Sequence, residues 1–250
     1  MNYIELFGFA GSGKTTIAAE LSAQKDVMAS VNKFDISTWN VLPSPSRVIP
    51  EPVRSKLGRA YWRAHAEPRL FTEFARDHPT FLSNTWSYVR AQHADDGIRR
   101  EKQRRLRETM ATYQWGKRAT ADEDMFILDE GFFHKIAVSA KATGTFPSDA
   151  WLRLVPPPRL IVHLDPPIDV LRSRRIQDHR DSIYHRAELE DILSGRTEFM
   201  TRAEQVGFPV VRIANVESPA SVVDRIMTEY LSISGVSREE PPPEPDLPTA

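Results

Sequence analysis

The sequence predicts an α/β fold in three layers, in which helices cover both faces of a five-stranded, mostly parallel sheet. Short apolar runs alternate along the chain with longer stretches of helical periodicity, which is typical of strands joined by helices. Most of these runs stop at acidic, proline or small polar residues, as strands buried on both faces do. The predicted strands are Tyr3–Phe7, Val27–Phe34, Met125–Leu128, Leu160–Leu164 and Pro209–Ile213.

Three stretches carry apolar residues at helical spacing. The first, Lys14–Ala23, places Ile17 and Leu21 on one face, and a second spans Glu190–Gln205. The final helix has the most regular apolar stripe, formed by Val222, Val223, Ile226, Met227, Tyr230 and Leu231. These stripes indicate helices that pack against the sheet.

The long middle of the chain, Pro52–Arg118, predicts helices broken at Pro68, Pro79 and Gly97. It lies between the second and third predicted strands, so we interpret residues 52–118 as a helical insertion within one domain. The Pro- and Ser-rich segment 42–52 is expected to be a loop. Residues 237–250 are rich in Pro and Glu without an apolar pattern, which predicts a disordered tail after a single domain at 1–236.

The composition limits the classes of function. The 33 basic and 34 acidic residues leave a formal net charge of -1, which does not favour nucleic acid or a membrane as partner. The absence of Cys excludes disulfides, Cys-bound zinc, iron–sulfur clusters and thiolate nucleophiles. No run approaches the ~18 apolar residues of a membrane span, and the first residues lack the pattern of a secretory signal. We therefore expect a cytoplasmic protein without a membrane anchor.

The most specific motif is Gly8–Thr15, which reads GFAGSGKT and matches the phosphate-binding pattern G-x-x-x-x-G-K-[ST] between a predicted strand and a predicted helix. Glycines let backbone N–H groups surround a polyphosphate, and the helix N-terminus adds positive potential. Lys14 is expected to reach the β- and γ-phosphates, and Thr15 to offer its hydroxyl to Mg²⁺. The candidate nucleotide-binding residues here are Gly8, Ala10, Gly11, Ser12, Gly13, Lys14, Thr15 and Thr16.

Two carboxylates follow the third predicted strand directly. In a fold of this kind such a strand end lies near the γ-phosphate, where a carboxylate holds Mg²⁺ or orients a nucleophile. We assign the Mg²⁺ role to Asp129, together with Thr15, and keep Glu130 as the near alternative. No histidine pair has metal-ligand spacing, so Mg²⁺ with ATP is the only metal expected, and His134 is interpreted as structural.

Arginines are concentrated after the fourth predicted strand. Helical spacing does not place all of them on one face, but arginine forks match the oxygens of a transferring phosphoryl group. A flap that carries them would also exclude water from the reaction. The segment contains Arg172, Arg174, Arg175, Arg180 and Arg186, of which Arg172 and Arg175 are the catalytic candidates.

The chain resembles the P-loop kinases of the nucleoside and nucleotide kinase type, close to thymidylate kinases and deoxynucleoside kinases. The resemblance rests on Gly8–Thr15, on Leu160–Pro167 with the arginine segment behind it, and on Val210–Asn215 before the final helix. It implies a P-loop NTPase fold, ATP as phosphoryl donor, and an arginine-bearing lid at about 172–186. It also implies that Asn215, in the loop after the fifth strand, lies beside the adenine.

Three carboxylates are candidates for the group that positions the acceptor hydroxyl. Val48–Val53 resembles a stretch of deoxynucleoside kinases whose Glu is the general base, which implies this role for Glu51, although Glu51 lies farther from the P-loop than in that family. The family's Asp-Arg-Ser-type stretch is replaced here by residues 129–132, where Glu130 stands. Asp35 follows the second predicted strand, where such folds meet the acceptor. The choice among the three is left open.

These features predict an ATP-dependent phosphotransferase that acts on a small hydroxylated or phosphorylated acceptor, most simply a nucleoside or nucleotide. One alternative is a nucleotide-dependent switch or NTPase that acts on a protein partner. A second alternative is a kinase for a polynucleotide or a modified DNA base, which the basic run Arg99–Arg107 suggests, although such runs are usually solvated helix faces. A monomer and a homodimer are both left open.

Overall fold

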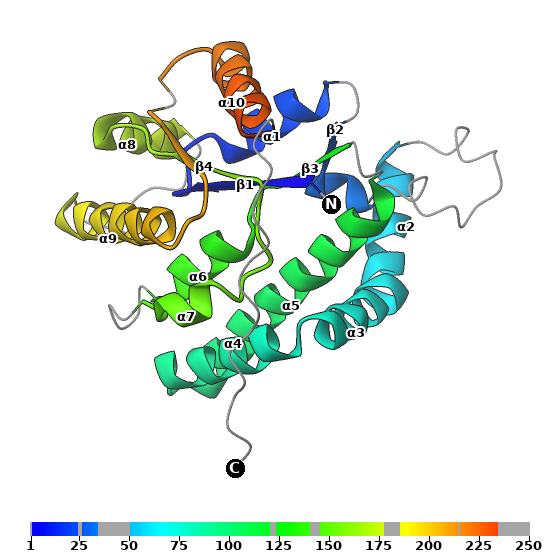
Figure 1. Cartoon of the computed structure of the whole chain (residues 1–250). Coiled ribbons are helices and arrows are strands. Elements are labelled where there is room, and N and C mark those ends of the chain that lie inside the picture. The colour runs from blue at the N-terminus through cyan, green and yellow to red at the C-terminus, as the bar shows by residue number, and fades with distance from the viewer. Residues whose placement is uncertain are drawn as a thin grey trace.

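A five-stranded parallel sheet organises the chain (Figure 1). The computed structural model describes residues 2–24, 27–34, 51–120, 124–140, 146–177, 186–214 and 216–234. The spatial strand order is β2-β3-β1-β4-β5, and every neighbouring pair is parallel. The strands are β1 (Asn2–Gly8), β2 (Val27–Ala29), β3 (Met125–Leu128), β4 (Leu160–Leu164) and β5 (Val210–Ile213).

The strand predictions are confirmed except for the second. β3 and β4 have the predicted bounds, β1 is one residue longer at each end, and β5 begins one residue later than predicted. β2 ends at Ala29, and Ser30–Phe34 forms the 3-10 helix η1 instead of continuing the strand. Pairing with β3 ends at Ala29, opposite Ile127, and the hydroxyl of the next residue, Ser30, bonds the carboxylate of Asp129 instead.

Helices cover both faces of the sheet, as Figure 1 shows. α1 (Lys14–Ser22) and α10 (Pro219–Ser234) pack on one face. The other face is covered by helices that include the long α5. The remaining helical elements are α2 (Glu51–Tyr61), the π-helical turn η4 (Trp62–Ala66), α3 (Glu67–Asp77), α4 (Pro79–Gln92), α5 (Asp96–Ala119), α6 (Phe132–Ala140), α7 (Asp149–Leu152), α8 (Ile168–Gln177) and α9 (Arg186–Gln205).

The alternation of β1 shows how the two cores form. Ile4 and Leu6 pack with apolar residues of α1 and α10, whereas Tyr3 and Phe7 join the larger core under α3 to α6. Successive side chains of a strand point to opposite faces, so an apolar run with both faces covered is buried throughout. Glu5 lies on the same face as Tyr3 and Phe7 and is fully buried.

The prediction that Pro68 breaks the middle helices is wrong. α2, η4 and α3 follow one another from residue 51 to 77 without interruption, and Pro68 lies in the first turn of α3. A proline ring in a helix collides with the carbonyl four residues earlier, and the wider π-helical turn at 62–66 accommodates it. The other two breaks are confirmed, because α4 begins at Pro79 and Gly97 lies in the first turn of α5.

The segment predicted as a loop at 42–52 is helical at its end, because α2 includes residues 51 and 52. Its residues 42–50, and the predicted tail at 237–250, lie outside the described residues. Among the helices that the structure describes, none combines the length and the apolar character needed to cross a bilayer.

The carboxyl edge of the sheet gathers polar residues that follow three of its strands. The P-loop follows β1, Ser30 follows β2, and the Asp129–Glu130 pair follows β3. Parallel strands bring their carboxyl ends to one edge, where open α/β sheets bind ligands. The candidate site therefore lies at this edge.

Candidate active site

The P-loop has the backbone of an anion cradle. Gly11 and Gly13 adopt φ values of 88° and 92°, in the left-handed region that glycine accepts without strain. The amide of Ser12 donates to the carbonyl of Phe9 at 3.1 Å, which closes the turn. Gly13 precedes α1, and no described side chain caps this helix start. The first amides of α1 are thus left for an anion.

Lys14 is buried against this loop. Its ammonium donates to the carbonyl of Gly8 at 2.9 Å and to that of Phe9 at 3.0 Å. Burial lowers the pKa of Lys14 to about 8, Glu130 opposes this effect, and the positive charge of Arg196 reinforces it. Thr15 and Thr16 are exposed at the start of α1, where their hydroxyls are open to a ligand or to solvent.

The two carboxylates after β3 have different neighbours. The Ser30 hydroxyl donates to Asp129, whose own amide donates to the Ser30 oxygen at 3.4 Å. Glu130 forms an ion pair with Lys135, and His134 Nε2 lies 3.8 Å from its Oε1. Burial raises the pKa of Glu130, but Lys135 outweighs burial and holds it below its usual value. The Glu130 carboxylate is therefore anionic at neutral pH.

His134 lies at the centre of this region, between the P-loop and Glu130. Burial, together with the charges of Lys14 and Arg196, holds the pKa of His134 well below its usual range. The imidazole is consequently neutral, so it adds no second positive charge beside Lys14.

Glu5 supports the turn from below. The amide of His134 donates to Glu5 Oε1 at 2.9 Å, so this carboxyl group accepts a hydrogen bond from the first turn of α6. A Cβ on Gly131 would collide with the Glu5 carboxyl group, so only glycine fits there. Burial raises the pKa of Glu5 to about 8, although hydrogen bonds from the amides of residues 132–134 act against this rise.

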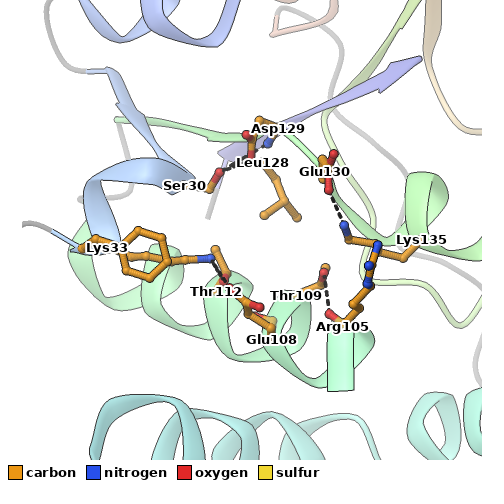
Figure 2. Close-up of a pocket in the computed structure, with 11 residues that line it drawn as sticks. Ser30, Lys33, Arg105, Glu108, Thr109, Thr112, Leu128, Asp129, Glu130 and Lys135 are labelled. Carbon is orange, nitrogen blue, oxygen red and sulfur yellow. Dashed lines mark hydrogen bonds and ion pairs between the residues drawn. The ribbon is translucent and has the colours of Figure 1, made fainter. Parts of the chain in front are cut away.

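A pocket of about 230 Å³ opens beside the two carboxylates (Figure 2). Four segments far apart in the sequence form it: η1, α5, the end of β3 with its turn, and α6. Figure 2 shows Lys33 and Lys135 entering from opposite sides. The lining residues are Ser30, Lys33, Phe34, Arg105, Glu108, Thr109, Thr112, Leu128, Asp129, Glu130 and Lys135.

Lys33 ties η1 to α5 in the wall of this pocket. Its ammonium donates to Thr112 Oγ1 at 2.9 Å and to Glu108 Oε1 at 3.3 Å. It also lies over the rings of Phe34 and Trp62, at 4.9 and 5.1 Å from their centroids. Burial lowers the pKa of Lys33, and Glu108 opposes this effect.

The structure brings some of the sequence-derived candidates together and leaves others aside. Lys14, Asp129 and Glu130 lie close enough for the charges of both carboxylates to act on the Lys14 ammonium. Arg172 is an exposed residue of α8. Arg175 belongs to α8 and Glu51 begins α2, but the side chains of these two are not described. Asp35, Asn215 and the lid residues 178–185 lie outside the described residues.

Several residues of the site were missed in the sequence. Ser30 and Lys33 fell inside a predicted strand, which hid their role at a strand end. Glu108 was part of a charge run, yet Arg105, Glu108 and Thr112 recur at helical spacing on one face of α5. That spacing was an available signal for a polar helix face turned toward a pocket.

The basic run of α5 is largely committed to ion pairs. Arg104 and Arg105 both bond Glu101, with Nε–O distances of 2.8 and 2.7 Å, and Arg99 pairs with Asp96. Arg107 pairs with Glu67 of α3 at 3.3 Å. This arrangement is that of a solvated helix face laced by ion pairs, and Arg105 alone among these arginines lines the pocket beside Glu130.

The metal chemistry of the site is that of hard oxygen donors. The Thr15 hydroxyl and the Asp129 carboxylate suit Mg²⁺, which takes one or two protein oxygens and completes its shell with water and phosphate. Among the described residues, no group of three or more His, Asp or Glu side chains forms a cage for a metal. Both donors are hard oxygen groups of the kind that a nucleotide-bound Mg²⁺ accepts.

Comparison with known proteins finds similarity in structure but not in sequence. No protein-family model and no curated protein matches the chain. The fold is similar to that of deoxyadenosine kinase from M. mycoides. Its structure with bound dATP has a TM-score of 0.48 at 13% identity, and the alignment covers 91% of this chain and 98% of that one. Its structure with bound dCTP has a TM-score of 0.45 at 14% identity, and the alignment covers 92% of this chain and 99% of that one.

Proposed function

We propose that this protein is an ATP-dependent phosphotransferase that moves the γ-phosphoryl group to a hydroxyl of a small acceptor, most simply a nucleoside. One observation carries the proposal: Asp129 and Glu130 act electrostatically on the P-loop Lys14 and also line the adjacent pocket. A phosphate cradle and a polar pocket therefore share one pair of carboxylates. Phosphoryl transfer requires such a donor site and acceptor site side by side.

The donor side consists of the P-loop amides and Lys14. The amides at the start of α1 bind the phosphate chain, and the Lys14 ammonium leaves its carbonyl partners on Gly8 and Phe9 for the β- and γ-phosphates. Thr15 and Asp129 would hold Mg²⁺, which when bound would supply positive charge against the charge that develops on the phosphates. Arg172 and Arg175 of the lid close over the transferring group, and Asn215 lies beside the adenine.

The transfer step balances without any further reactant. The acceptor oxygen attacks the γ-phosphorus, a new P–O bond forms, and the bond between that phosphorus and the β,γ-bridging oxygen breaks to release ADP. The hydroxyl proton passes to a carboxylate. Glu130 is the candidate among the described residues that lines the pocket, and Asp35 and Glu51 are the alternatives. Positioning and electrostatics supply most of the catalysis in such reactions.

The charges of the pocket favour a neutral acceptor. Three cations line it, and each is paired with a carboxylate: Lys33 with Glu108, Lys135 with Glu130, and Arg105 with Glu101. A phosphorylated acceptor would bring two negative charges to a wall whose positive charge is already compensated. A nucleoside requires hydrogen bonds and an aromatic face, which the hydroxyls of the wall and the Phe34 ring supply.

The size of the pocket supports a small acceptor over a polynucleotide. Its volume of about 230 Å³ is below the roughly 300–1,000 Å³ of pockets that hold drug-sized ligands. The ion pairs on the outer face of α5 further reduce the positive surface that a phosphate backbone would need. We propose a cytoplasmic enzyme with one kinase domain at 1–236, as a monomer or a homodimer.

The test is a panel of acceptors with labelled ATP and Mg²⁺. We expect label to appear on the 5′-hydroxyl of at least one nucleoside and not on nucleoside monophosphates. Transfer only to monophosphates would overturn the neutral acceptor, and transfer to no member of a panel that also includes sugars and oligonucleotides would overturn the kinase.

Nucleotide consumption without any acceptor separates a kinase from a switch protein. A kinase excludes water from its active site and hydrolyses ATP very slowly when no acceptor is present. We therefore expect ADP release to rise at least about a hundredfold when the acceptor is added. Steady hydrolysis that no acceptor accelerates would favour a nucleotide-dependent switch acting on a protein partner.

A further inference from the structure

One arginine of α9 lies against the P-loop, far from the loop in sequence. The guanidinium carbon of Arg196 lies 4.8 Å from the centroid of the Phe9 ring and 5.9 Å from that of Phe7. Arg196 is only 8% exposed, which is rare for an arginine in a folded protein. Neither the P-loop motif nor the predicted lid includes this residue.

An apolar cluster explains how α9 reaches the loop. Phe9, the second residue of the P-loop motif, packs with Leu171 of α8 and Leu189 of α9. Three more apolar residues of the two helices, Ile168, Ile192 and Leu193, surround this cluster. The motif leaves most positions between its glycines open to any residue type. Here the Phe9 side chain packs the P-loop against α9, the helix that carries Arg196.

The position of Arg196 places a second cation beside Lys14. The Arg196 charge lowers the pKa of Lys14, of His134 and of His163, so its field reaches the P-loop and the β4 end. Two cations held together in a buried place repel each other, and an anion that binds between them relieves the repulsion. A guanidinium also offers several N–H donors in a fork that matches phosphate oxygens.

We propose that Arg196 is a phosphate-binding residue of the donor site, held beside the P-loop by the Phe9 ring, and that it contacts the phosphate chain together with Lys14. This inference rests on the proposed function, because it needs a nucleoside triphosphate on the P-loop. It differs from the lid hypothesis, since Arg196 of α9 already lies beside the P-loop through the Phe9 ring and does not depend on residues 172–186.

The test uses tripolyphosphate, which occupies the phosphate cradle without base or sugar. We compare the wild type with Arg196→Met, which keeps the length of the side chain but removes its charge. Arg202→Met is the matched control on the same helix, because Arg202 pairs with Asp149 at 2.7 Å. We expect Arg196→Met to weaken tripolyphosphate binding at least tenfold, as loss of a charge-assisted hydrogen bond does, and Arg202→Met to leave it unchanged.

Two additional measurements separate contact from support of the fold. In wild-type protein, the ¹⁵Nε resonance of Arg196 is expected to shift when tripolyphosphate is added, and a side chain that only supports the fold would not respond. Arg196→Lys retains a cation and is expected to lose less affinity than Arg196→Met, so it tests the inference even if the methionine variant fails to fold.

The outcomes distinguish the two proposals. Wild-type affinity in Arg196→Met, or an Arg196 resonance that does not respond, overturns the role of Arg196 while the donor site stands. If neither tripolyphosphate nor ATP with Mg²⁺ binds the wild-type protein, the proposed function fails first and the inference fails with it.

Discussion

The two halves of the candidate site are built in different ways. The donor half is centred on one continuous stretch, Gly8–Thr15, whose ligand groups are mostly backbone amides, and the Arg196 side chain of α9 lies beside it. The acceptor half collects side chains from η1, α5, the turn after β3 and α6, and its charges are paired with one another. A backbone cradle needs only local geometry, whereas a pocket of side chains exists only once distant segments have packed. The donor half is thus expected to fail abruptly when altered, and the acceptor half gradually.

The largest expected effect is on the donor half. Lys14→Ala removes the ammonium group that we propose binds the β- and γ-phosphates. We expect kcat to fall about 10³-fold, which is the effect of losing a preorganised donor that stabilises charge in the transition state. The fold should persist, which circular dichroism checks. Lys56→Ala, an exposed change on α2, is the control. Undiminished turnover in Lys14→Ala would refute the donor assignment.

The second prediction concerns Glu5, the buried carboxyl group of β1 that bonds the start of α6. The pKa of Glu5 is about 8 in the folded protein and ordinarily 4.5, so the folded state holds a proton that the unfolded state releases between these values. The stabilisation from the protonated group is present below about pH 4.5 and is lost as the pH rises through about 8. We expect the free energy of unfolding to fall by a few kcal/mol across this window, and Glu5→Gln to flatten the decline.

Urea unfolding of both proteins between about pH 5 and about pH 8 measures this difference. Parallel pH profiles for wild type and Glu5→Gln would show that Glu5 does not titrate in that window. Such a result would remove the link that Glu5 makes between β1 and the start of α6.

A smaller effect is expected in the acceptor half. Lys33→Met removes the nearer of the two cations beside Glu108, leaving Arg104 at 3.9 Å, and removes the donor to the Thr112 hydroxyl. The wall therefore loses its alignment and part of its charge balance. We expect KM for the acceptor to rise about tenfold, in line with the loss of one charged hydrogen bond, with KM for ATP unchanged. Arg107→Met on the outer side of α5 is the control. Equal rises in both KM values would contradict a division into two halves.

The smallest effect is expected from Thr112→Val. This change keeps the shape of the side chain and removes only the hydroxyl, which accepts from Lys33 at 2.9 Å and donates to the Glu108 carbonyl at 2.7 Å. Only the bond with Lys33 joins the two sides of the pocket wall, so we expect a rise of about threefold in the acceptor KM, with kcat nearly constant. Steady-state kinetics with the acceptor varied at saturating ATP measures it, and a collapse of kcat would mean that Thr112 acts on the chemistry instead.

The difference between local backbone geometry and contacts of distant segments also explains which features could be predicted from the sequence. The P-loop and the strands at Met125–Leu128 and Leu160–Leu164 depend on local composition and on burial of both faces, and both signals can be read along the chain. Asp129 and Glu130 were found because a strand end in a parallel sheet has a known neighbourhood. Where a residue type alone decides the local structure, prediction succeeded.

Prediction failed where the partner of a residue lies far away in sequence. The extension of the second strand to Phe34 was wrong because the length of β2 depends on its pairing with β3, which ends at Ala29. Arg196 was not singled out because only the packing of Phe9 on α9 gives it a role. Pro68 misled because a π-helical turn, invisible in the apolar pattern, accommodates its ring.

The central claim is that the Gly8–Thr15 loop binds the phosphate chain of ATP. Isothermal titration of the wild-type protein with ATP and Mg²⁺ tests it most directly, with Lys14→Ala measured in parallel. The account predicts saturable binding of one nucleotide per chain in the wild type and at least a tenfold weaker interaction in the variant. No heat and no thermal stabilisation of the wild type, or equal affinities in the two proteins, would contradict it.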